Sequence, residues 1–221
     1  MSDQPLNINQ PAFWEEIYQN GRAGWDLGGP TPALRRLLES GELAPGRMTL
    51  ATAASAVVVL GAGRGHDARE FARHGFKVTA VDFAAHAAVS MRRLADPQAP
   101  IDILQADIFT LPHTLDHTFD VVLEYTCFCA INPARRGEYA DLVARLIKPG
   151  GAYVALLFPL DQHKGGPPFA VSADEALSLF TARGFHLLRR ETPPDSAPQR
   201  RGLEELLIFR QAGAVPPPGH A

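Results

Sequence analysis

The chain has 221 residues, of which 46% are hydrophobic and 20% charged, so we expect one hydrophobic core in a single domain over residues 1–221. The formal net charge of −3 gives no electrostatic reason to expect nucleic acid or an anionic membrane as a partner, because both favour basic surfaces.

The N-terminal part of the chain is predicted to form two short helices. The first covers Pro11–Asn20 and is stopped by Gly21. The second starts at Thr31, which is expected to cap it with its side chain, and ends at Gly41. The chain begins without the apolar core of a secretory signal, and its longest apolar stretch, Met48–Leu60, is too short to span a bilayer. We therefore predict a soluble, cytoplasmic protein.

From Val57 onward, short apolar segments alternate with amphipathic ones. Seven strands are predicted, at Val57–Leu60, Lys77–Asp82, Ile101–Ala106, Phe119–Glu124, Ala152–Phe158, Phe185–Glu191 and Leu203–Arg210. Further helices are predicted at about Asp67–His74, Ala84–Ala95 and Asn132–Ile147, and after the capping-box pair Ser172 and Glu175.

This alternation predicts an α/β fold of the Rossmann-like type, with a mostly parallel sheet and helices on both of its faces. No helix separates the last two strands, so the last strand should run antiparallel, because a parallel partner needs a crossover. A turn is expected at residues 148–151, before the fifth strand. Residues 213–221 are predicted to be a disordered tail.

A glycine-rich loop, Gly61-Ala62-Gly63-Arg64-Gly65, lies between the first strand and its helix. Glycines at this place allow a tight turn and let the backbone approach a ligand closely, although a turn needed only for packing is the alternative. The dinucleotide fingerprint of dehydrogenases requires a third glycine where this chain has His66. The complete dehydrogenase pattern is therefore absent.

Two aspartates follow the next two strands. Asp82 ends the second strand, where a carboxylate can accept hydrogen bonds from the two hydroxyls of a ribose; it could instead cap the following helix. Asp107 follows the third strand, where it can address the edge of an adenine or simply shape a turn. A glycine loop that is followed in order by Asp82 and Asp107 predicts a ligand that contains adenosine.

Four separated stretches resemble the thiopurine S-methyltransferase superfamily, and in particular its branch of thiol, thiocyanate and halide methyltransferases. They occur in the order of that family, as FWEEIYQNGRAGWDLGGPTPAL, VLGAGRGHDAREFARHGFKVTAVD, EYTCFCAINPARRGEYADLVARLIKPGG and FPLDQHKGGPPFAVS. One departure is Leu60-Gly61-Ala62-Gly63, where relatives commonly have Pro-Gly-Cys-Gly. The glycines are retained, so the departure leaves the cofactor loop intact.

The resemblance implies a class I methyltransferase that uses S-adenosyl-L-methionine, with residues 1–40 as helices that form a lid over the cofactor. The cofactor contacts that it implies are Trp14, Trp25, Gly61, Gly63, Gly65, Asp82, Phe83, Asp107, Ile108 and Tyr125. The acceptor pocket that it implies consists of Tyr125, Phe128, Pro167, Pro168 and Phe169. Plain core packing is the alternative for each tryptophan.

Other polar residues do not point to catalysis. Cys127 and Cys129 are too close in sequence for a structural disulfide and have no second Cys/His pair at zinc spacing, so we predict no metal site and place them beside the acceptor pocket. Arg135 and Arg136 are expected to be surface charges, with an acceptor contact for one of them left open. No general base, no role for Glu124 and no oligomeric state can be assigned from the sequence.

The predicted function is methyl transfer from S-adenosylmethionine to a small, soft nucleophile, such as a thiol, thiocyanate, hydrosulfide or a halide. The alternatives are another small acceptor, namely a thiopurine, a selenium or tellurium species or an oxygen nucleophile, and a non-catalytic module that binds S-adenosylmethionine. A dehydrogenase is the third alternative.

Overall fold

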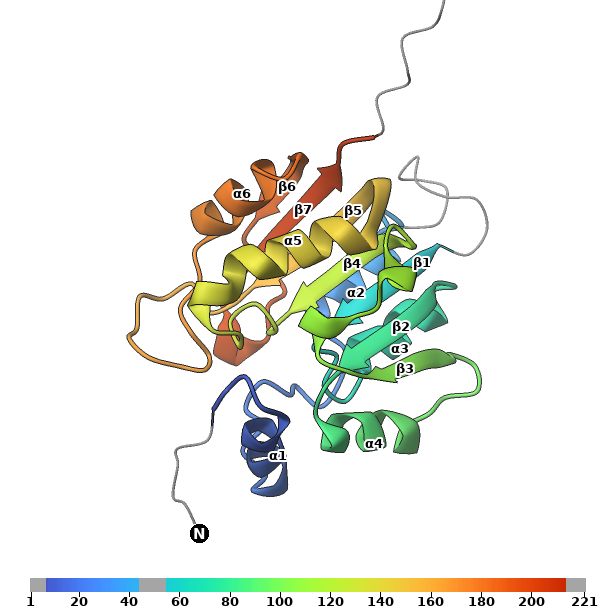
Figure 1. Cartoon of the computed structure of the whole chain (residues 1–221), viewed down its shortest axis with the longest axis vertical. Coiled ribbons are helices and arrows are strands. Elements are labelled where there is room, and N and C mark those ends of the chain that lie inside the picture. Colours follow the sequence, from blue (N-terminus) through green and yellow to red (C-terminus); the bar gives the residue numbers. More distant parts are fainter. Residues whose placement is uncertain (1–6, 44–54, 214–221) are drawn as a thin grey trace, which may run out of the picture.

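The computed structural model describes residues 7–43 and 55–213, so all but the first residue of the predicted disordered tail lies outside the described residues. These residues form a seven-stranded sheet with the order β3-β2-β1-β4-β5-β7-β6 (Figure 1). The strands are β1 (Ala56–Leu60), β2 (Lys77–Asp82), β3 (Ile101–Gln105), β4 (Phe119–Tyr125), β5 (Ile147–Leu157), β6 (Phe185–Glu191) and β7 (Glu205–Gln211).

β7 pairs antiparallel with both β5 and β6, whereas the pairs among the first five strands are parallel. The predicted mostly parallel sheet with an antiparallel last strand is thus confirmed. The α-helices are α1 (Pro11–Gln19), α2 (Pro32–Glu39), α3 (His66–Arg73), α4 (Ala85–Arg93), α5 (Arg136–Leu146) and α6 (Ala173–Thr181).

The alternation of side chains along the central strands builds a core on each face of the sheet. In β1, Val57 and Val59 pack into the core beneath α2 and α3, whereas Val58 and Leu60 pack into the core beneath α5 and α6. Because both faces are covered, the strand is apolar throughout, as the sequence pattern predicts. Helices on both faces are therefore confirmed.

α1 lies away from both cores, beyond the carboxyl ends of the parallel strands and beside α4 (Figure 1). The N–H of His86 in α4 donates to the Glu15 carboxylate of α1 at 2.9 Å, and the rings of Tyr18 and His86 stack at 5.1 Å. This position places α1 over the edge of the sheet where the glycine loop and the strand-end aspartates lie.

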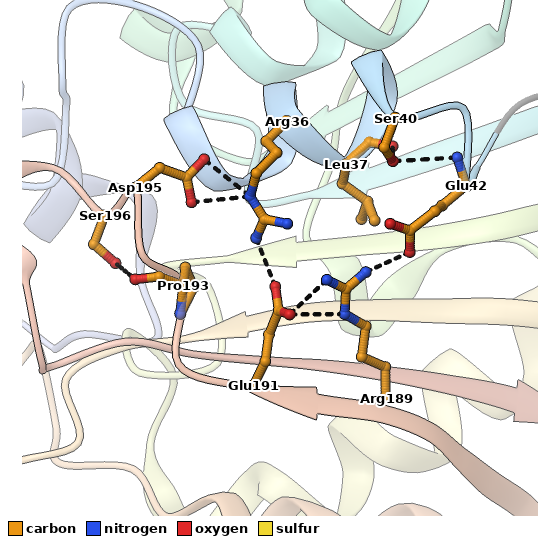
Figure 2. A network of polar contacts seen from close by, with 9 residues as sticks. All are labelled: Arg36, Leu37, Ser40, Glu42, Arg189, Glu191, Pro193, Asp195 and Ser196. Carbon is orange, nitrogen blue, oxygen red and sulfur yellow. Dashed lines mark hydrogen bonds and ion pairs between the residues drawn. The ribbon is translucent and has the colours of Figure 1, made fainter.

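α2 is tied to neighbouring elements by polar contacts at its start and along its length. Thr31 precedes it, but its side chain does not cap the helix as predicted: its hydroxyl donates instead to Asp67 of α3 at 2.8 Å. Further along, Arg36 donates to Glu191 at 2.5 Å and to Asp195 at 3.1 Å, and Arg189 links Glu191 to Glu42 (Figure 2). The α2 helix is thereby tied to β6 and to the connection that follows it.

The region around β5 differs from the sequence prediction. α5 ends at Leu146 and β5 begins directly at Ile147, so the segment 148–151 belongs to the strand and is not a separate turn. The ladder between β4 and β5 shifts register there. Gly150 has a φ of +79°, and a Cβ on Gly151 would come within 2.9 Å of the Asp120 carbonyl oxygen, so the two glycines allow an irregular strand. The predicted capping box before α6 is confirmed in part: Ser172 accepts from the Glu175 N–H, whereas the Glu175 carboxylate accepts from Arg136.

Candidate active site

The glycine loop joins β1 to α3 at the carboxyl end of the sheet. Gly61, Gly63 and Gly65 have φ values of +63°, +56° and +71°, where residues with a side chain are strained. A Cβ on Gly61 would lie 2.9 Å from Cys127, and one on Gly65 would lie 2.9 Å from Met91. Gly61 and Gly65 are thus required by packing as well as by the turn, and Gly61 also lines the cavity described below.

Asp82 is buried at the end of β2 and fixes the glycine loop. Its two carboxylate oxygens accept hydrogen bonds from the N–H groups of Gly63 at 2.8 Å and Ala84 at 2.9 Å. Burial raises the pKa of Asp82 to about 6, against the opposing effect of these hydrogen bonds. Asp82 does not cap the following helix, the alternative left open by the sequence, because α4 begins after Ala84 and has no side-chain cap. Its carboxylate lines the cavity.

The segment after β3 forms a second part of the same cavity. Asp107 accepts from the Phe109 N–H at 3.0 Å, so its side chain shapes the turn, and both Asp107 and Ile108 line the cavity. The Arg135 guanidinium lies 3.5 Å from the centre of the Phe109 ring and is paired with Glu138. Arg135 also lines the cavity, so it is not only a surface charge.

Aromatic side chains of the N-terminal segment cover this cavity, and we call Trp14, Tyr18 and Trp25 the aromatic roof. The ring of Trp25 meets those of Trp14 and Tyr18 edge to face at 5.5 Å and 5.3 Å, and all three line the cavity. The Trp14 indole N–H donates to the Ile8 carbonyl at 2.8 Å. Tyr18 was missed in the sequence, although it lies four residues after Trp14 and hence on the same helix face.

The turn after β4 is strained and carries both cysteines. Thr126 has a φ of +62°, an uncommon conformation for a β-branched residue, and its hydroxyl donates to the Tyr125 carbonyl at 2.7 Å. The Glu124 carboxylate accepts from the N–H groups of Cys127 at 3.0 Å and Phe128 at 2.7 Å. Glu124, whose role the sequence left open, therefore holds this turn against the glycine loop.

Cys127 and Cys129 are free, buried thiols that line the cavity, as expected from their place in the sequence. Burial raises the pKa of both thiols well above the usual value, so both are protonated at neutral pH. Pro167, Pro168 and Phe158, the residue after β5, complete an apolar wall on this side. Phe158 was missed in the sequence, although every strand end at this edge is a candidate.

Three predicted acceptor-pocket residues do not line this cavity. Phe128 is fully buried and packs against Tyr139 of α5 with ring centres 5.5 Å apart. Phe169 donates its N–H to the Cys129 carbonyl at 2.7 Å, and its ring packs on Gly166. Tyr125 points to the other side of the turn, where its hydroxyl donates to Glu204 at 2.5 Å. Their predicted contact with the acceptor stays a prediction.

The cavity has a volume of about 450 Å³, within the usual range of small-molecule sites. Of the predicted cofactor residues, the roof tryptophans, Gly61, Asp82, Phe83, Asp107 and Ile108 line it. Gly63 and Tyr125 line a smaller cavity of about 60 Å³ next to it, which shares Trp25, Gly61 and Thr126 with the large one. Gly65 is the N-cap residue of α3.

Other charged residues lie away from this site. Arg136 is buried, not a surface charge as predicted: it donates to Glu175 at 2.7 Å and to the Ala170 carbonyl at 2.9 Å, because α5 packs beside α6. Within residues 7–43 and 55–213, no three His, Cys, Asp or Glu side chains are grouped closely enough to bind a metal ion. None of the helices among these residues is long and apolar enough to cross a membrane.

Comparison with known proteins identifies the family to which this chain belongs. The sequence profile of thiopurine S-methyltransferase matches residues 9–206. The chain belongs to the thiopurine S-methyltransferase family. The match covers all the cavity residues except Ile8, and it confirms the resemblance seen in the sequence.

Two similar relatives come from Arabidopsis thaliana. The probable thiol methyltransferase 2 is 32% identical, over 91% of this chain and 85% of that protein. Thiocyanate methyltransferase 1 is 30% identical, over 87% and 82%. A thiopurine S-methyltransferase of Pseudomonas fluorescens is 27% identical, over 77% and 82%.

Solved structures support the fold. The 1,6-didemethyltoxoflavin-N1-methyltransferase of Burkholderia thailandensis, with bound S-adenosylhomocysteine, has a TM-score of 0.68 at 20% identity, with coverage of 96% and 93%. The magnesium protoporphyrin IX methyltransferase of Synechocystis has a TM-score of 0.69 at 11% identity, with coverage of 96% and 100%. The fold is that of class I methyltransferases.

As a member of this family, the chain is an S-adenosylmethionine-dependent methyltransferase, and S-adenosylmethionine is its cofactor. The described residues fit this group. A buried carboxylate, Asp82, ends β2, the partly buried Asp107 follows β3, and aromatic rings cover the space between them and the glycine loop. The dehydrogenase and the non-catalytic module are thereby set aside.

Proposed function

We propose that the enzyme methylates a small, soft nucleophile, namely a thiol, thiocyanate, hydrosulfide or a halide. The observation that carries this proposal is the chemistry of the wall formed by Cys127, Cys129, Phe158, Pro167 and Pro168. It consists of apolar rings and of thiols that stay protonated. This wall offers neither a general base nor a cation to an acceptor.

Such a wall favours an acceptor that arrives as an anion and loses its water easily. Desolvation is costly for a localised charge such as a carboxylate or alkoxide, and less so for a large, polarizable one. When bound, S-adenosylmethionine supplies an electrophilic methyl group on a positively charged sulfur. The residues of the wall and the roof then contribute by aligning the acceptor and by excluding water, which is worth up to about 7–11 kcal/mol.

In this proposal Asp82 and Asp107 hold the adenosine part of the cofactor, with Phe83 and Ile108 beside it. The aromatic roof closes over the methionine part. The names of the two Arabidopsis relatives, which specify a thiol and thiocyanate, support a sulfur acceptor for this chain. The net charge of −3 supports a small molecule over nucleic acid as the acceptor. The two unbridged cysteines support a cytoplasmic location.

The test follows S-adenosylhomocysteine release with thiocyanate, hydrosulfide, halides, small thiols, a thiopurine, a selenium oxyanion product and a catechol. We expect sulfur anions to have the highest kcat/KM and iodide to exceed chloride. Because the wall supplies no base, kcat/KM for a series of thiols at one pH should follow the fraction of each thiol that is ionised.

Two results would contradict the proposal. One is a catechol or carboxylate that is methylated far better than every sulfur acceptor and halide. The other is a thiol whose kcat/KM stays constant at pH values well below its own pKa, because that requires a base in the site. The family assignment would survive either result.

A further inference from the structure

Arg200 is a buried arginine that the predicted site does not include. It lies in the connection between β6 and β7, at the end of the short helix Pro198–Arg200, and is only 2% exposed. A fully charged guanidinium in such a place needs partners for its N–H groups. Its partners belong to distant parts of the chain, and two of them lie at the cavity.

The first partner is the backbone of the aromatic roof. One terminal nitrogen of Arg200 donates to the Trp25 carbonyl at 2.6 Å. Trp25 lies in the segment between α1 and α2, outside either helix, so no helical hydrogen bond fixes this carbonyl. Because the Trp25 ring packs on Trp14 and Tyr18, a fixed Trp25 backbone also places the other rings of the roof.

The second group of partners belongs to the wall and its support. The guanidinium of Arg200 lies 4.5 Å from the centre of the Phe158 ring and 5.0 Å from that of Tyr125. Its other terminal nitrogen donates to the Tyr125 hydroxyl, which in turn donates to the buried Glu204 carboxylate. This chain of hydrogen bonds orients the guanidinium and supplies a compensating negative charge.

We propose that Arg200 is a positioning residue for methyl transfer, which holds Trp25 of the roof against Phe158 of the acceptor wall. Arg200 does not line the cavity and so acts through these two residues. The role concerns the methyltransferase activity itself and does not depend on which acceptor is used.

The two tryptophans of the chain, Trp14 and Trp25, both belong to the roof, so intrinsic tryptophan fluorescence reports on the roof alone. In Arg200→Gln, we expect a red-shifted, more easily quenched emission, also in a Trp14→Phe background where Trp25 is the only source. The Kd of S-adenosylhomocysteine should rise about tenfold or more, because the charged hydrogen bond that holds Trp25 is lost and the ligand must then order the roof itself. The KM of the acceptor should rise as well.

Arg201→Gln is the matched control, since Arg201 is the exposed neighbour of Arg200. A folded Arg200→Gln protein with the emission, Kd and KM of that control would overturn the proposal. Arg200→Lys keeps the charge but cannot reach both the Trp25 carbonyl and the Tyr125 hydroxyl. Tyr125→Phe removes the hydroxyl that orients Arg200. Both variants should therefore show smaller changes in emission, Kd and KM than Arg200→Gln, in the same direction. If Arg200→Gln does not fold, Arg200→Lys and Tyr125→Phe test the proposal in its place. Wild-type emission and wild-type affinity in both of these variants would overturn the proposal.

Discussion

Asp82 combines two tasks at the scale of one residue, because it holds the glycine loop and lines the cofactor cavity. Asp82→Ala should weaken the binding of S-adenosylmethionine and S-adenosylhomocysteine about tenfold or more, since hydrogen bonds to a charged group are lost. Calorimetry measures this directly. Asp102→Ala, an exposed aspartate on β3, is the control. Equal affinities in the two variants would show that Asp82 does not bind the cofactor.

The sequence correctly predicted the position of site residues that directly follow a strand. Asp82 and Asp107 follow strands that end at the same edge, so both could be placed at the cavity before the structure was known. Phe128 and Tyr125 were placed by resemblance alone, and neither lines the large cavity: Phe128 packs on Tyr139 and Tyr125 binds Glu204. Arg200 meets Trp25 across 175 positions, and no local pattern predicts such a contact.

At the scale of elements, the N-terminal part of the chain has two functions. α1 and Trp25 cover the cavity, whereas α2 is built into one face of the sheet and held by Arg36 (Figure 2). The predicted lid of residues 1–40 therefore contains an element that packs in the core. Helix periodicity finds both helices, but it does not tell which surface each of them covers.

Removal of residues 1–30 should therefore leave a folded sheet, with α2 still bound to Asp67 through Thr31, and should strongly reduce cofactor affinity. Circular dichroism and calorimetry check the two parts of this prediction. Deletion of residues 1–6 alone is the control, because it keeps Ile8 and Trp14. Wild-type affinity in the longer deletion would show that the segment is not a lid.

At the scale of the whole molecule, three carboxyl groups among residues 7–43 and 55–213 have raised pKa values. Burial raises the pKa of Asp67 and Asp82 to about 6 and that of Glu124 to about 7. The folded protein therefore binds more protons than the unfolded chain at pH values between the ordinary carboxyl pKa and about 7. The stability that these groups contribute is fully present below their unfolded pKa and is lost as the pH rises through 6 to 7.

We expect a higher thermal midpoint at about pH 5.5 than at about pH 8. Glu124→Gln should reduce this difference, because the amide oxygen still accepts from Cys127 and Phe128 but no longer ionises. A midpoint that rises with pH over this range, or a variant with the wild-type pH dependence, would contradict this assignment.

The position of β7 also determines when the sheet becomes complete during synthesis of the chain. β6 pairs with β7 and with no other described strand, so a nascent chain that has left the ribosome only as far as β6 exposes a strand without a neighbour. The anchor of Trp25, Arg200, leaves the ribosome just before β7. Completion of the sheet and anchoring of Trp25 thus both require the short segment that contains Arg200 and β7. A chain that ends before this segment lacks both the completed sheet and the anchor of Trp25, although it already contains the residues that line the cofactor cavity.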